Sequence, residues 1–146
     1  MQTRILVDYS GKSRLDELGI NIRIHEDSNP MPKEGKRSLD LQNLRIQELK
    51  MSSNMSFYWK QALVHPGPGF LPDLQMAFAL AEAANHSEIP LKEELEAGKT
   101  LAFGTLLKIG DEDAVPYIYK NGVWSVGVRK ISEGVGRNLL WSAFVR

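Results

Sequence analysis

The stretch PDLQMAFALAEAAN at residues 72–85 constrains the fold more than any other part of the chain. Nearly every residue is Ala, Leu, Met or Phe, and the polar residues Gln75 and Glu82 lie on one stripe. We predict a helix because a proline suits its first position, Asp73 complements the positive helix end and Asn85 can cap the other end. A helix that is apolar on most sides must be buried. The chain therefore needs a sheet that this helix can cover.

The last third of the chain supplies strands for such a sheet. We predict strands at TLAFGTLLKI, VPYIYK and VWSVGVRK, which form a three-stranded antiparallel meander. The last two flank Asn121-Gly122, a strong hairpin signal because a type I′ turn needs positive φ at both positions. A two-residue loop there pairs Tyr119 with Trp124. The side chains then predicted to share one face are Tyr117, Tyr119, Trp124, Val126 and Val128.

The first half of the chain is less regular. TRILVDY is a strand candidate, and in INIRIH the residues Ile20, Ile22 and Ile24 alternate with polar ones, which predicts one apolar face. Residues 26–38 contain two prolines, a glycine and charges of both signs, which predicts a flexible loop. Residues 39–64 leave strand and helix open, although the offset apolar pairs in SLDLQNLRIQELKM favour a bulged strand. PLKEELEAG predicts a short helix, and NLLWSAFVR a last strand or short helix.

The length of 146 residues fits one domain. We therefore expect residues 1–146 to form a single α+β domain, with a mainly antiparallel sheet packed against the one buried helix. The C-terminal meander forms the end of that sheet. An apolar fraction of 42% and a charged fraction of 25% are those of an ordinary folded protein.

Composition and charge exclude several classes of function. The chain has no cysteine, so disulfides, thiolate metal sites and cysteine nucleophiles are excluded. Lys plus Arg and Asp plus Glu both total 18, and this balance argues against a dedicated nucleic-acid binder. Asp8 interrupts the N-terminal apolar run, which argues against a signal peptide, and no apolar segment approaches the roughly 20 residues of a membrane helix. We expect a cytoplasmic protein that does not contact a membrane.

The chain carries no clear motif for a cofactor, a metal or a catalytic group. Gly11-Lys12-Ser13 ends like a phosphate-binding loop, but the first glycine of a Walker loop would fall on Leu6, inside a strand. His65 in HPGPGF is a candidate general base, yet no nucleophile lies at a spacing that implies a partner. The other histidines, His25 and His86, also lack the repeated spacing of metal ligands. We therefore predict no cofactor and no metal site.

The aromatic hairpin is the best functional candidate. Tyr and Trp dominate interface hot spots because they combine a large contact area with a polar group. We interpret the chain as a small non-enzymatic protein that binds a protein partner, of the inhibitor, immunity or adaptor type. The candidate partner-binding residues are Tyr117, Tyr119, Trp124 and Arg129. The alternative for these aromatic side chains is the core, because a sheet must bury one face.

Two other functions stay open. One is a small metal-independent hydrolase or nuclease that pairs His65 or His25 with nearby carboxylates. The other is a weak nucleic-acid or anion binder that uses Arg129, Lys130 and Arg137. The sequence favours a protein without catalysis but does not exclude an enzyme, and a homo-oligomer is compatible with each reading.

Overall fold

The computed structural model describes residues 1–10, 14–28, 30–49, 59–60, 72–96, 99–133 and 141–145. Its helices include α2 (Leu74–His86), the short α3 (Lys92–Glu96) and the 3₁₀ turns η1 (Arg14–Glu17), η2 (Leu41–Asn43) and η3 (Ile131–Glu133). The strands are β1 (Arg4–Asp8), β2 (Ile22–Ile24), β3 (Lys36–Asp40), β4 (Arg45–Leu49), β5 (Lys99–Leu101), β6 (Leu107–Ile109), β7 (Glu112–Asn121), β8 (Val123–Lys130) and β9 (Trp141–Val145). No helix within these ranges is long and apolar enough to cross a membrane.

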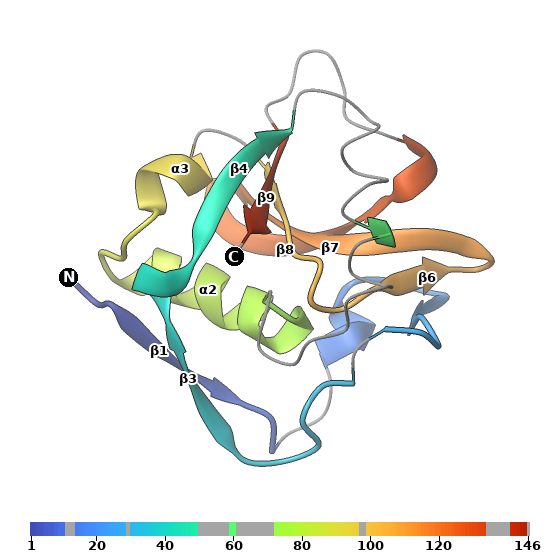
Figure 1. Cartoon of the computed structure of the whole chain (residues 1–146), viewed down its shortest axis with the longest axis horizontal. Helices are drawn as coiled ribbons and strands as arrows, with labels where there is room; N and C mark the ends of the chain where they lie inside the picture. The colour runs from blue at the N-terminus through green and yellow to red at the C-terminus, as the bar shows by residue number, and fades with distance from the viewer. Residues whose placement is uncertain are drawn as a thin grey trace.

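The strands form two sheets. In the larger one the order is β2, β6, β7, β5, β9, β4, and β8 pairs with the other edge of β7. Strands β1 and β3 form a separate antiparallel pair (Figure 1). Among the described strands, the parallel pairing is that of β5 with β9. The α+β class and the mainly antiparallel sheet are confirmed, as is the C-terminal meander, which consists of β6, β7 and β8.

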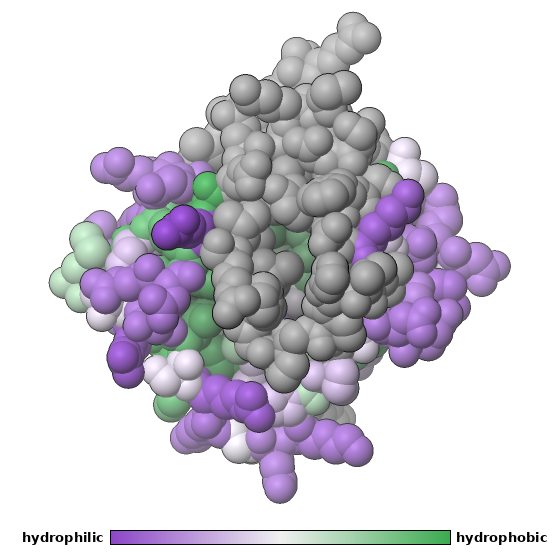
Figure 2. Space-filling model, in the orientation of Figure 1, coloured by the Kyte–Doolittle hydropathy of each residue, from purple (hydrophilic) through white to green (hydrophobic). Residues whose placement is uncertain are grey.

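Helix α2 lies between the two sheets (Figure 1). It packs against β1 on one side and against β7 and β8 on the other, and its small residues Ala77, Ala81 and Ala84 allow a close approach. The predicted burial of this helix is confirmed. Figure 2 shows hydrophilic residues along the rim of the described part, with hydrophobic residues visible between them. The core cluster comprises Ile5, Leu41, Leu44, Ala77, Leu80, Ala81, Ala84, Ile89, Leu95, Ala102, Ile118 and Trp124.

The start of α2 is fixed by buried polar groups. Asp73 is its N-cap, and the carboxylate accepts hydrogen bonds from the Met76 N–H at 2.9 Å and the Tyr9 hydroxyl at 2.6 Å. The Leu74 N–H donates to the Thr105 hydroxyl at 2.9 Å, so a further unpaired donor of the helix end is satisfied. Burial raises the pKa of the Asp73 carboxyl and of the Tyr9 hydroxyl. This end of the helix therefore depends on contacts from distant parts of the chain.

The caps of α2 differ from the predicted ones. Pro72 precedes the cap instead of taking the first helical position, and Ser87 is the C-cap in place of Asn85. The Asn85 side chain bonds to the backbone of Trp124 instead. The Trp124 N–H donates to Asn85 Oδ1 at 2.7 Å, and Asn85 Nδ2 donates to the Trp124 carbonyl at 3.0 Å. A carboxamide carries the same donor and acceptor as a peptide group, so it can satisfy both groups of one strand residue.

The predicted strand TLAFGTLLKI is divided into β5 and β6. Both pair antiparallel with the same edge of β7, but between them the five residues Ala102–Leu106 oppose only Val115 and Pro116. Pro116 has no N–H to donate, and its carbonyl accepts a hydrogen bond from the Ala102 N–H at 2.9 Å. The proline thus explains why the strand is interrupted by a bulge at this point.

Strand β2 also differs from the predicted alternation. Ile20 is 88% exposed and Ile24 is 37% exposed, whereas His25 is only 8% exposed. Asn21 adopts φ 61 in the turn before the strand, so Ile20 does not belong to the ladder. The predicted apolar face of this segment is wrong, and a polar residue is buried there instead.

The ambiguous segment after residue 38 begins as strand, turn and strand. The Asp40 carboxylate at the end of β3 accepts a hydrogen bond from the Gln42 N–H and caps η2, and β4 follows in the other sheet. The offset between the apolar pairs marks this 3₁₀ turn.

The predicted loop at 26–38 overlaps β3, because Lys36–Ser38 already pair with β1. Most of residues 50–64 lie outside the described ranges. The predicted short helix is confirmed as α3. The element predicted at the end as a strand or short helix is the strand β9.

Thr100 on β5 tests the cost of a buried hydroxyl. Its side chain is fully buried, and within the described structure its hydroxyl has no hydrogen-bond partner. Thr100→Val keeps the shape and the β-branch but removes this hydroxyl. We expect the free energy of unfolding to rise by about 1–2 kcal/mol, as measured by urea denaturation followed by circular dichroism.

Thr105→Val is the matched control. Thr105 is equally buried, but its hydroxyl accepts a hydrogen bond from the Leu74 N–H. Valine at this position leaves that N–H unpaired, so we expect a loss of about 1–2 kcal/mol. Equal losses in the two variants would contradict the difference between the two hydroxyls.

Candidate functional site

The β7–β8 hairpin is shifted by one residue from the predicted register. Lys120, and not Tyr119, pairs with Trp124, and only Gly122 lies beyond the ladder at the tip. Gly122 has φ 78, whereas Asn121 stays in the strand without the positive φ that a type I′ turn needs at both positions. A shift of one residue turns the side chains of one strand to the other face relative to its partner. The predicted shared face is therefore wrong.

The four candidate residues lie on opposite faces of the hairpin. Trp124 is 4% exposed and belongs to the core on the α2 side, together with Ile118. Tyr117, Tyr119 and Arg129 share the other face, and each is half-buried. The structure thus keeps three of the four together and places Trp124 in the core.

The surface that contains the tyrosines is called the tyrosine face below. It consists of Tyr117, Tyr119, Ser125, Gly127 and Arg129, which all point away from α2. The rings of Tyr117 and Tyr119 have centroids 5.2 Å apart and are tilted by 38°, within the range in which aromatic rings attract each other. From β5, Lys99 Nζ lies 5.6 Å from the centroid of the Tyr117 ring, a cation–π distance.

Gly127 determines where the Tyr117 ring can lie. A Cβ atom on Gly127 would be 2.9 Å from Tyr117 Cζ and 3.0 Å from the Tyr117 hydroxyl oxygen. The ring therefore crosses directly over the β8 backbone at this glycine. Any larger residue at this position would displace the ring, so the glycine is needed for the close approach.

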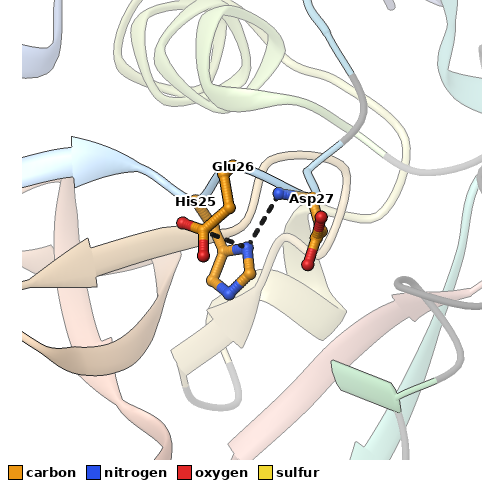
Figure 3. A group of neighbouring side chains, drawn as sticks. All are labelled: His25, Glu26 and Asp27. Atoms are coloured by element: carbon orange, nitrogen blue, oxygen red, sulfur yellow. Dashed lines mark hydrogen bonds and ion pairs between the residues drawn. The ribbon is translucent and has the colours of Figure 1, made fainter.

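A second group of polar side chains meets at the end of β2. His25 Nδ1 accepts a hydrogen bond from the Asp27 N–H at 3.0 Å and lies 4.0 Å from the Glu26 carboxylate (Figure 3). His25 Nε2 lies 3.6 Å from Asp113 Oδ1 on β7. The Trp59 ring meets the imidazole edge-on, with centroids 5.6 Å apart and planes at 80°. Both ring nitrogens thus face polar groups while the ring itself is buried.

The backbone of the β5–β6 bulge holds this histidine in place. The His25 N–H donates to the Leu106 carbonyl at 2.8 Å, and the Leu106 N–H donates to Ser28 Oγ at 2.8 Å. Glu26 is exposed, and its pKa is lowered mainly by its own backbone N–H, with smaller contributions from His25 and Lys108. The arrangement therefore depends on the bulge, a feature that strand patterning did not predict.

The geometry around His25 restricts both catalysis and metal binding. A general base needs a lone pair within reach of a substrate proton. Here Nδ1 already accepts from the Asp27 N–H, so in the neutral ring the proton lies on Nε2 and faces Asp113. His25, Glu26 and Asp27 can bring three ligand atoms within 4.8 Å of one another, but a metal on Nδ1 would have to displace that hydrogen bond. The spacing of the histidines did not predict that these three side chains come together, because a tight turn after β2 produces the arrangement.

Several residues singled out in the sequence lie outside the described ranges, namely Gly11-Lys12-Ser13, His65 and Arg137. Of the proposed anion-binding group, Lys130 pairs with Glu112 at 2.7 Å and thereby lowers the pKa of that carboxyl.

In the comparisons with known proteins, no family model, curated protein or solved structure matches the chain. The function must therefore be inferred from the chemistry of the chain itself.

Proposed function

We propose that the chain is a small non-enzymatic binding protein that recognises a protein partner through its tyrosine face, as an inhibitor, immunity-type or adaptor protein does. The observation that carries this proposal is the tilted Tyr117–Tyr119 pair on the sheet face opposite α2. Tyrosines offer a large, rigid contact area with only two rotatable side-chain bonds, and their hydroxyl groups can hydrogen-bond to a partner.

The surroundings of the tyrosines support this proposal. Gly127 admits the Tyr117 ring, and the ammonium group of Lys99 lies near the same ring. A surface that is ordered before binding loses less conformational entropy when a partner docks. Arg129 adds a guanidinium group to the same face, and arginine is enriched in protein interfaces.

The hydrolase or nuclease alternative has one observation in its favour, the His25–Asp113 pair. It has weaker support than the binding function because both imidazole nitrogens already face groups of the protein itself. The anion-binding alternative relies on Arg129 and Lys130, and Lys130 forms an ion pair with Glu112.

Tyr119→Ala tests the proposed binding function. With the tagged protein as bait in a native lysate, we expect recovery of the bound partner to fall by about tenfold or more, because tyrosines often act as hot spots. Leu6→Ala is the control, because Leu6 is a large exposed side chain on β1, in the other sheet. Circular dichroism checks the fold of each variant. Equal recovery with all three proteins, or no specific partner, would contradict the proposal.

A further inference from the structure

Strand β8 lies at an edge of the larger sheet. One side of it pairs with β7 from Val123 to Lys130, and none of the other described strands pairs with its second side. An edge strand presents backbone N–H and C=O groups on which an incoming chain can add as a further strand. The groups that β8 presents follow from its hydrogen bonds.

Trp124 identifies the outward-pointing positions. Its N–H and carbonyl both bond to the side chain of Asn85, while its partner in the register with β7 is Lys120. Trp124 therefore occupies a non-hydrogen-bonded pair, and its backbone groups point away from β7. Hydrogen-bonded and non-hydrogen-bonded pairs alternate along an antiparallel strand. The backbone N–H and carbonyl groups of Val126 and Val128 therefore point away from β7 as well.

Pro116 gives independent support for this assignment. It is the β7 partner of Val128, and its carbonyl bonds to the Ala102 N–H on the opposite side of β7. Pro116 has no N–H of its own, so it cannot form the pair of bonds that a hydrogen-bonded position requires. Val128 must therefore direct its N–H and carbonyl toward the free edge.

Asn85 shows what kind of group this edge accepts. Its carboxamide accepts from the Trp124 N–H and donates to the Trp124 carbonyl, as a residue of an added antiparallel strand would. The protein thus fills the first outward position with one of its own amides. Val126 and Val128 continue the same row of backbone groups.

The tyrosine face borders this row. The Tyr117 ring crosses the β8 backbone at Gly127, between Val126 and Val128. A strand added along Val126 and Val128 would therefore place its own side chains beside that ring. The ring favours an aromatic or apolar side chain at this point of the added strand.

We propose that the free edge of β8 binds an extended segment of the protein partner, which adds as a strand along Val126 and Val128 and places an aromatic or apolar side chain against Tyr117. This inference rests on the proposed function and specifies how the partner binds. A short segment fits better than a second copy of the chain. Beyond Asn85 the edge offers only a few backbone groups for hydrogen bonding. So short a contact buries much less accessible surface than the roughly 1,200 Å² of a stable protein dimer.

Val128→Pro is the decisive variant. It removes the outward N–H, which takes no part in the ladder with β7, and proline is tolerated at such edge positions. Val128→Thr keeps that N–H and a similar shape. Linear peptides enriched on the wild-type protein from a displayed random library serve as the probe. We expect Val128→Pro to weaken their Kd by about tenfold or more, and Val128→Thr to change it by about twofold or less.

Amide hydrogen exchange measures directly whether the backbone amides at this edge are protected. In the free protein the Val126 and Val128 amides should exchange quickly and the Trp124 amide slowly, and an enriched peptide should protect both valine amides. Slow exchange of the valines in the free protein would overturn the inference, because the edge would already be covered. Equal peptide binding to all three proteins, or a library without enriched peptides, would also overturn it.

Two further results separate the inference from its premise. A wild-type dimer that Val128→Pro converts to a monomer would assign the edge to a second copy and overturn the peptide proposal. If Val128→Pro leaves recovery of the native partner unchanged while Tyr119→Ala abolishes it, only the strand-addition mode fails. If neither variant affects recovery, the proposed function fails as well.

Discussion

Trp124→Ala should lower the free energy of unfolding by about 3–5 kcal/mol, a large part of the roughly 5–15 kcal/mol that stabilises a typical domain. The indole is buried in the core with Ile118 on the α2 side of the hairpin, and Lys120 Nζ lies 5.7 Å from its ring centroid. Alanine leaves a cavity that a small core cannot close. Urea denaturation followed by far-ultraviolet circular dichroism measures the loss.

Two other variants make this result specific. Trp124→Phe retains most of the apolar volume, so its loss should be smaller, at about 1–3 kcal/mol. Tyr119→Ala removes a half-buried ring from the opposite face and should also cost less than Trp124→Ala. A loss below about 1 kcal/mol in Trp124→Ala would contradict the core assignment and return the indole to the binding surface.

Helix α2 could be predicted from the sequence because its signals are local. Apolar residues on most sides, an acidic residue at the start and a proline before it suffice to define a buried helix. Its caps could not be predicted in full. The Asp73 carboxylate accepts a hydrogen bond from Tyr9, which lies near the N-terminus, and Asn85 bonds to Trp124 on β8, which comes much later in the chain.

The hairpin could be predicted, but its register could not. The Asn-Gly dipeptide indicates a turn without fixing the number of residues in it. In the predicted register Trp124 would share a face with Tyr119, so Trp124 and Ile118 could not both be buried against α2. The observed register buries both and leaves Tyr117 and Tyr119 on the other face. Packing against the helix therefore selects the register, and a single strand pattern does not contain that contact.

The polar group around His25 was beyond prediction from spacing. His25 looked like a residue on the wet face of a strand, and its burial depends on the bulge between β5 and β6. Asp113 reaches it from a different strand of the same sheet. One weak signal was present in the sequence, namely Pro116, which cannot donate to a neighbouring strand and so marks the place where the ladder breaks.

Asp73→Ala should lower the free energy of unfolding by about 2–4 kcal/mol. The change removes the N-cap acceptor for the Met76 N–H and leaves the buried Tyr9 hydroxyl without its partner. These two losses act on the helix that lies between both sheets, so they affect the packing of both. Tyr9→Phe removes only the second contact and should cost less, and a larger loss in Tyr9→Phe than in Asp73→Ala would contradict this account.

Asp73→Asn isolates the effect of the charge. The amide oxygen can still accept from the Met76 N–H, but the side chain no longer titrates. Burial raises the pKa of Asp73 in the folded protein, so the folded state holds this proton more tightly than the unfolded state. The contribution of Asp73 to stability is therefore greatest below the pKa of the unfolded carboxyl and is lost as the pH rises through the raised folded pKa.

The pH dependence of the two proteins gives a direct test of this sign. Glu17 and Glu112 have lowered pKa values and act in the opposite direction, so the stability of wild type alone mixes both effects. These groups are common to wild type and Asp73→Asn, and they cancel in the difference. In urea denaturation between about pH 3 and pH 7, the free energy of unfolding of wild type minus that of Asp73→Asn should fall as the pH rises. A difference that stays constant with pH would show that the Tyr9 and backbone hydrogen bonds balance the burial of this carboxylate, and a difference that rises would show that they outweigh it.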